Sequence, residues 1–241
     1  MKKSIFLLIA FFIILLVSCV TSSTQASNLN IEKIIPDHIN GDRTPAPVSD
    51  FRIEERTTDV IIWAYTGDSS IVVLPDEING KPLSVRGTAF GRDVIEVFVN
   101  STNKNLISVN GVLYSKDGTM LISYPRGRDE STFIIPNHVT KIDSLAFSGA
   151  NNLIEVVFSK NLEHIYLWAF FNCVNLGDID LPETITYIGS EAFSGCLNIH
   201  NINIPDSLER AEIAINAFRG IENLNERTKQ KILLFWGSSV L

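Results

Sequence analysis

Residues 181–199 read LPETITYIGSEAFSGCLNI, and the chain repeats the main features of this stretch at a nearly constant interval. Each copy has a phenylalanine near its middle, and the regular copies have an isoleucine five positions before it. The interval is about 23 residues in the regular copies and slightly longer in the last one. The phenylalanines that mark the copies are Phe90, Phe147, Phe170, Phe193 and Phe218. A period in the twenties is typical of a solenoid, whose long faces serve for binding.

Each repeat unit contains two extended segments joined by a corner. Residues 153–158 (LIEVVF), 176–182 (LGDIDLP) and 199–205 (IHNINIP) have apolar side chains at positions one, four and six. The last positions alternate as in a strand with one buried face, and Pro182 and Pro205 end the pairing because proline lacks an amide donor. A second apolar pair follows, and the phenylalanine is placed to fill the centre of the coil.

The stretch 181–199, the Ala169-Phe170 pair with Cys173, and residues 139–147 together carry a family resemblance. They resemble the treponemal-type, or BspA-like, bacterial surface leucine-rich repeats, and the resemblance covers roughly residues 58–220. It implies a β-rich leucine-rich-repeat solenoid, α/β horseshoe-like, with repeats of about 23 residues. It also implies surface exposure and adhesion to host matrix or to other bacteria.

The beginning of the chain indicates export. Residues 1–18 contain two lysines, an apolar run and a final serine, which is the pattern of a secretory signal peptide. The apolar run is too short to span a bilayer. Residues 16–19 (LVSC) resemble the bacterial lipoprotein processing box, which implies that Cys19 carries the lipid anchor. The alternative is a simple signal peptide with an accidental cysteine.

The rest of the chain divides into three predicted segments. Residues 19–50 are predicted to be a lipidated, flexible tether, because the stretch after Cys19 is small and polar. Residues 51–221 form the repeat solenoid. Residues 222–241 are predicted to form a capping helix, with Asn225 as its N-cap and Gly237 as its stop.

Two hairpins are expected in the first half of the solenoid. Residues 60–65 and 71–74 are apolar and flank a turn, which predicts a hairpin that closes the N-terminal end. Around residues 110–125, Asp117-Gly118 lies between two alternating apolar runs, and this predicts a hairpin insertion that replaces one coil or projects from it. The alternative is a divergent repeat that keeps the stack continuous.

Charge and motifs exclude several function classes. The net charge is −7, and without residues 1–18 there are 18 basic against 27 acidic side chains, a balance of −9. This argues against a nucleic-acid partner, which requires a basic face. The sequence has no His-x-x-x-His pair, no nucleophile elbow, no phosphate loop and no dinucleotide fingerprint. We therefore expect no catalytic residue, no metal site and no cofactor.

Cys173 and Cys196 are separated by the repeat interval and therefore occupy equivalent places in neighbouring coils. Adjacent strands are close enough for a disulfide, but stacked equivalents keep their Cβ atoms too far apart for the preferred geometry. Buried free thiols are the favoured interpretation, with a disulfide as the alternative. Two thiols without a histidine also fall short of a four-ligand metal site.

The candidate binding residues lie at positions three and five of the first strand of each unit, because alternate side chains point away from the core. The two expected columns are Glu96, Glu155, Asp178 and Asn201, and Phe98, Val157, Asp180 and Asn203. Exposed Phe98 and Val157 would form a binding hot spot, unless the hairpin block covers them. The acidic column is more simply a solvated face than a cation site, since it lacks a ligand loop.

Together these observations predict a lipid-anchored binding protein of the bacterial cell envelope, at the outer membrane or cell surface. Its partner would be a protein or matrix ligand on the strand face, and the lipid would hold it at the membrane. The alternative is a periplasm-facing scaffold lipoprotein.

Overall fold

The computed structural model describes residues 43–205, 212–214 and 216–237. The predicted signal peptide, Cys19 and most of the predicted tether lie outside the described residues. All described residues belong to one compact unit, Ile35–Leu241.

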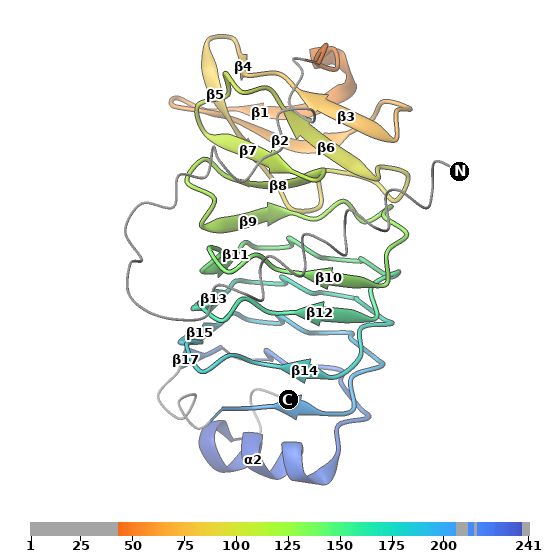
Figure 1. Ribbon diagram of the computed structural model, residues 1–241, viewed down its shortest axis with the longest axis vertical. Helices are drawn as coiled ribbons and strands as arrows, with labels where there is room; N and C mark the ends of the chain where they lie inside the picture. Colours follow the sequence, from red (N-terminus) through yellow and green to blue (C-terminus); the bar gives the residue numbers. More distant parts are fainter. Residues whose placement is uncertain (1–42, 206–211, 215, 238–241) are drawn as a thin grey trace, which may run out of the picture. The chain divides into compact units, whose positions relative to one another are not determined.

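The coils stack in parallel on two sides, which confirms the predicted solenoid. On one side, Lys141 pairs with His164 and His164 pairs with Tyr187, each partner lying one repeat interval further along the chain. The strands of this side are β9 (Met120–Ser123), β11 (Lys141–Ile142), β13 (His164–Ile165), β15 (Tyr187–Ile188) and β17 (Glu212–Ile213). On the other side, β10 (Thr132–Ile134) pairs with β12 (Glu155–Val157), and β14 (Ile179–Asp180) pairs with β16 (Ile202–Asn203). Figure 1 shows these two series of strands following the stack of coils.

Aromatic rings form a continuous ladder through the centre of the coils. The ring centroids of Phe147 and Phe170 are 4.7 Å apart, those of Phe170 and Phe193 5.1 Å, and those of Phe193 and Phe218 5.8 Å. Tyr124, which stands one repeat interval before Phe147, stacks on it at 5.1 Å and supplies the first rung. The four phenylalanines are almost fully buried, so each ring is shared by its own coil and the next.

The corner before each ring requires a left-handed residue. Two positions before the phenylalanine, the backbone has φ of 63° at Leu145, 56° at Trp168, 51° at Glu191 and 60° at Asn216. This conformation turns the chain so that the amide of Phe147 donates to the carbonyl of residue 169 in the next coil at 2.8 Å. The same bond recurs one coil later.

The buried thiols support the corner. Cys173 and Cys196 are free, as expected, and each Sγ–H donates to a phenylalanine carbonyl of the preceding coil at 3.0 Å. Burial raises the pKa of the Cys196 thiol, which keeps it in the donating, protonated form.

Asparagine side chains form a second ladder, along the turns. Each amide nitrogen donates to a backbone carbonyl of the preceding coil, at distances from 2.7 to 3.3 Å. The asparagines are Asn152, Asn175, Asn198 and Asn223. Each of them stands at the same distance after the phenylalanine of its own unit, so this ladder was readable from the sequence but was not predicted.

The predicted N-terminal hairpin is wrong in its strand pairing. Strand β2 (Val60–Tyr65) pairs antiparallel with β1 (Phe51–Glu55) and parallel with β5 (Lys81–Val85), while β4 (Glu77–Ile78) joins β5. Strand β3 (Ile71–Leu74) instead pairs in parallel with β6 (Glu96–Val99). The physical reason is that β2 and β3 are the two sides of one coil, so each pairs with its counterpart in the following coil.

Residues 43–50 pack against the folded domain, although the sequence analysis assigned them to the tether. The amide of Ala46 donates to the carbonyl of Val73 at 2.8 Å, and a short 3-10 helix, η2 (Val48–Asp50), leads into β1. The folded domain therefore begins before residue 51.

The block near residues 110–125 combines both predicted alternatives. Strands β7 (Leu106–Val109), β8 (Val112–Ser115) and β9 form an antiparallel meander, and the hairpin turns at Asp117. The same β9 pairs in parallel with β11. The hairpin is therefore real, and it replaces one side of a coil without interrupting the stack.

Two hydrophobic clusters lie on either side of this block. The larger contains the ring ladder, and the smaller contains Phe90 with Val60, Leu83 and Val97. Phe90 thus marks a repeat in the sequence but does not join the ladder.

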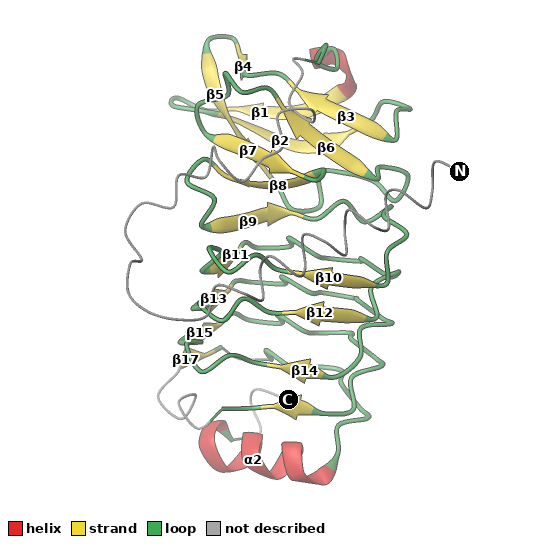
Figure 2. Cartoon of the chain, viewed as in Figure 1, coloured by secondary structure: helices red, strands yellow, loops and turns green. Residues whose placement is uncertain are grey.

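Helix α2 (Glu226–Trp236) follows the last coil, as predicted. The Asn225 side chain accepts from the Thr228 amide at 2.9 Å, and Gly237 with φ of 73° ends the helix. Within this helix, the side chains of Thr228 and Ile232 are buried. Figure 2 shows that the coils themselves consist of short strands and loops, with α2 after the last of them.

Replacing Phe170 by Ala should lower the free energy of unfolding by about 3–5 kcal/mol, because a ring in contact with two neighbouring rungs is lost from a closed core. Urea denaturation followed by circular dichroism measures this change. The control Leu197→Ala removes a side chain that is mostly exposed, and its cost should stay below about 0.5 kcal/mol. Equal costs for the two variants would contradict the central role of the ladder.

Candidate functional site

The outward side chains of β10, β12, β14 and β16 form a surface that we call the strand face. Ile134 lies opposite Val157 and Thr132 opposite Glu155 in one strand pair. Asp180 lies opposite Asn203 in the other. The two pairs are linked where the amide of Gly177 donates to the carbonyl of Ile154 at 2.8 Å. Figure 1 shows β10, β12 and β14 in this order on successive coils.

Phe98 does not belong to the strand face, contrary to the expectation from the sequence. Its side chain is 5% exposed, and the guanidinium carbon of Arg43 lies 3.9 Å from its ring centroid. The segment before β1 therefore covers this position, and the neighbour of Val157 is Ile134. Glu96 is half-buried and lies against Gly111, where an added Cβ would come within 2.7 Å of the Glu96 Cγ.

Two of the polar candidates have structural roles. The Oδ1 atom of Asp178 accepts from the amides of His200 and Asn201, at 3.1 and 2.8 Å. The Oδ1 atom of Asn201 in turn accepts from Asn225 and Thr228 at the start of α2. The Asn201 side chain therefore holds the start of the C-terminal helix, and its Oδ1 atom is already occupied by hydrogen bonds.

Two exposed aliphatic side chains, Ile134 and Val157, lie opposite each other on this face, and the exposed Ile154 directly precedes β12. We call these three residues the apolar patch. Ile134 is 57% exposed, Ile154 56% and Val157 41%. Sequence reasoning identified Val157 but missed Ile134, because β10 was not assigned. The available signal was Pro136, which stands two repeat periods before Pro182 and ends an equivalent strand.

Beside the apolar patch the strand face is acidic. Glu155, Asp178 and Asp180 come from consecutive coils, and none of the ion pairs between described side chains includes them. The Asp180 carboxylate accepts from the Asn203 amide at 2.6 Å, and Glu155 accepts from the Thr132 hydroxyl at 3.4 Å.

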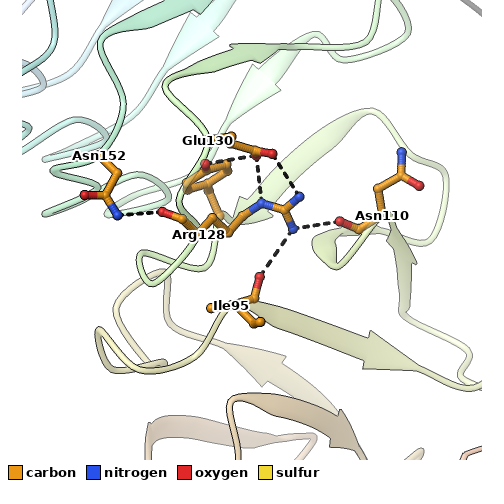
Figure 3. Close-up of polar contacts among 6 residues, drawn as sticks. Ile95, Asn110, Arg128, Glu130 and Asn152 are labelled. Atoms are coloured by element: carbon orange, nitrogen blue, oxygen red, sulfur yellow. Dashed lines mark hydrogen bonds and ion pairs between the residues drawn. The ribbon is translucent and has the colours of Figure 1, made fainter. Parts of the chain in front are cut away.

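A polar cluster centred on Arg128 connects the coils to the N-terminal strands (Figure 3). The guanidinium donates to Glu130 at 2.7 and 3.2 Å, and to the carbonyls of Asn110 at 2.8 Å and Ile95 at 3.3 Å. The Tyr124 hydroxyl donates to Glu130 at 3.0 Å. Asn110 and Ile95 flank the smaller core, whereas Tyr124 begins the ring ladder, so Arg128 bridges the two.

The charges in this cluster stabilise one another. Burial alone would lower the pKa of Arg128, but the hydrogen bonds and charge of Glu130 outweigh it and raise that pKa. Burial, with a smaller effect of Glu130, also raises the pKa of Tyr124. Both groups therefore keep their protons, and the cluster is a structural bridge rather than an acid–base pair.

A second partly exposed cluster lies on the other side of the coils and was not predicted. The rings of His164, Tyr166 and Tyr187 are 5.8 to 6.1 Å apart between centroids. His164 Nδ1 lies 3.9 Å from the Glu163 carboxylate, too far for a hydrogen bond. The sequence signal for this cluster was the placement of His164 and Tyr187 one repeat interval apart.

Within residues 43–205, 212–214 and 216–237, no three His, Cys, Asp or Glu side chains are grouped closely enough to hold a metal ion. The described helices are also too short or too polar to cross a bilayer.

Residues 128–240 match the family of the BspA type leucine rich repeat region, in six copies. This part of the chain is similar to BspA-type leucine-rich repeats. The match begins at Arg128 and contains the coil series β10 to β17 together with α2. None of the curated proteins matches the chain.

A solved structure shows the same fold. A leucine-rich repeat protein from Eubacterium ventriosum is 22% identical, with a TM-score of 0.53, over 67% of this chain and 49% of its own. The chain thus spans about half the length of that protein. A leucine rich cell surface protein from Faecalibacterium prausnitzii is 23% identical with a TM-score of 0.49, over 65% of this chain and 46% of its own. The T. pallidum leucine rich repeat protein is 21% identical with a TM-score of 0.48, over 81% of this chain and 97% of its own.

Replacing Arg128 by Met should lower the free energy of unfolding by about 2–3 kcal/mol, because it leaves Glu130 and two carbonyls without their charged donor. The double variant Arg128→Met with Glu130→Gln should recover part of this loss. As a control, Lys229→Met breaks the exposed pair with Glu226 and should cost under about 0.5 kcal/mol. Urea denaturation measures all three, and equal losses for Arg128→Met and Lys229→Met would contradict the bridge.

Proposed function

We propose that this protein is a lipid-anchored interaction protein of the bacterial cell surface, which binds another macromolecule through the strand face. The observation that carries the proposal is the apolar patch: Ile134, Val157 and Ile154 are all exposed on regular, hydrogen-bonded coils. The fold is stable without burying these side chains, so their burial would contribute free energy to the binding of a partner.

The strand face has the properties of a preformed binding surface. Coil-to-coil bonds such as that between Gly177 and Ile154 hold the backbone, and the side chains are fixed on short paired strands. A rigid surface loses little conformational freedom when a partner binds. An apolar centre with polar groups at the rim is typical of protein–protein interfaces.

The other elements of the proposal come from the sequence and the family. Residues 16–19 have the form of a lipoprotein processing box, and the BspA-type repeats favour a binding role over an enzymatic one. A solenoid of this kind offers faces rather than a cleft. An adhesive role toward host matrix or other bacteria is therefore the function that this geometry supports best.

Replacing Ile134 by Ser should reduce adhesion of the expressing cells to immobilised basement-membrane extract by at least about tenfold, since truncating a hot-spot residue costs about 2 kcal/mol. Thermal unfolding should be nearly unchanged, because Ile134 is mostly exposed. The matched control is Leu197→Ser, which is similarly exposed at a corner of a coil and should leave adhesion intact. Equal adhesion of wild type and Ile134→Ser would exclude the strand face as the adhesive surface.

Protease treatment of intact cells tests the location separately. Digestion of the protein, with a periplasmic control protein left intact, is expected for a surface adhesin. Protection until the envelope is opened would instead favour the periplasm-facing scaffold.

A further inference from the structure

We infer that the partner of the strand face is a basic polypeptide segment, in which an aliphatic side chain lies close to two or more arginine or lysine residues. The inference rests on the proposed function and adds the chemical class of the ligand. Two observations carry it: the position of the apolar patch beside the acidic residues, and the way in which each carboxylate is held.

The aliphatic and acidic side chains lie along one line. Ile134, Val157 and Asp180 occupy the same strand position in three consecutive coils, and Glu155 and Asp178 accompany them in the neighbouring column. Neighbouring strands are about 4.8 Å apart. In an extended peptide, every second side chain points to the same side, at intervals of ~6.8 Å. If such a peptide binds along the stack, the side chains that face the protein contact first the apolar patch and then the carboxylates.

Each carboxylate has one oxygen held by the protein and one available. Asp178 uses Oδ1 for two backbone amides, Asp180 uses Oδ1 for Asn203, and Glu155 uses Oε2 for Thr132. Among the described residues, the second oxygen of each carboxylate has no hydrogen-bond partner. The side chains are therefore oriented before binding, with an acceptor free for a cationic donor.

Among the described residues, no lysine or arginine forms an ion pair with Glu155, Asp178 or Asp180. Strands β10, β12, β14 and β16 contain no lysine or arginine. Lys160 follows β12 and Glu183 follows β14, so these two flanking residues add no net charge. The charge of Arg128 is balanced by its ion pair with Glu130. A ligand on this face meets three carboxylates, and charge complementarity selects cationic groups.

Other ligand classes fit less well. Nucleic acids and anionic polysaccharides would be repelled by the carboxylates. The three acidic side chains are not grouped as metal ligands within the described part of the chain. A cationic polysaccharide lacks the aliphatic side chains that would cover Ile134 and Val157, whereas a polypeptide supplies both kinds of group.

Selection from a phage-displayed library of random dodecapeptides on the full-length protein tests the inference without knowledge of the natural ligand. The protein is immobilised through a C-terminal tag, and the selection is run in low salt. Enriched peptides should carry a net positive charge and at least one Leu, Ile or Val. Their affinity, measured by fluorescence anisotropy with the synthetic peptides, should fall at least about tenfold between about 50 mM and about 500 mM salt, because salt screens exposed charges.

Isosteric variants separate the charge from the fold. Glu155→Gln with Asp178→Asn and Asp180→Asn keeps every structural acceptor oxygen but removes three charges. This triple variant should bind the selected peptides at least about tenfold more weakly and should unfold at the same temperature as wild type. The control triple variant Glu77→Gln, Asp93→Asn and Glu222→Gln removes three exposed charges elsewhere and should bind normally.

Different results would overturn different statements. Enrichment of neutral or acidic peptides, or unchanged affinity in the first triple variant, would exclude a basic ligand. If Ile134→Ser still abolishes binding in that case, the strand face remains the binding surface of the proposed function. Peptides that bind wild type and Ile134→Ser equally would exclude both this inference and the strand face. A selection without any enriched peptide would also overturn the inference, since it requires that short basic segments bind.

Discussion

The structure depends on one constraint: equivalent residues of successive coils must lie directly above one another. The nearly constant repeat interval achieves this by bringing an aromatic ring to the same place in each coil, where Phe147, Phe170 and Phe193 stack with ring centroids 4.7 and 5.1 Å apart. The last interval is two residues longer, and Phe218 still stacks on Phe193 with ring centroids 5.8 Å apart, so the extra residues are accommodated outside the ladder. The left-handed corner residues and the amide bonds around each phenylalanine hold the ring in its place, and the strands on both sides of it pair from coil to coil.

The sequence predicted the parts of the fold that repeat. The ring ladder, the two extended sides and the buried thiols follow from residue types at a nearly constant spacing, whereas the C-terminal helix follows from its cap residues Asn225 and Gly237. The pairing of β3 with β6 was missed, because a local apolar pattern cannot distinguish a hairpin from the two sides of one coil. Only the longer interval that relates Ile71 to its partner Glu96 contained that information.

The strand face was predicted in outline but not in detail. Strand alternation correctly assigned Val157, Asp180 and Asn203 to the surface. It failed at Phe98, since burial there depends on Arg43, a residue from a distant segment with no repeat pattern. A contact between a repeat and a non-repeating segment has no periodic signal, so sequence analysis of the repeats alone cannot find it. The Arg128 bridge escaped prediction for the same reason.

The asparagine ladder has a consequence for how such a chain changes its length. Each turn gives one amide donor to the preceding coil and offers one carbonyl to the following coil, so donors and acceptors are balanced within every unit. The first acceptor is the carbonyl of Arg128, and the last donor is Asn223 just before α2. An in-frame duplication of one unit between these two ends therefore leaves no polar group of the ladder unpaired. Such a duplication would lengthen the strand face by one row while both ends keep their own contacts, so the size of this face can change in whole coils.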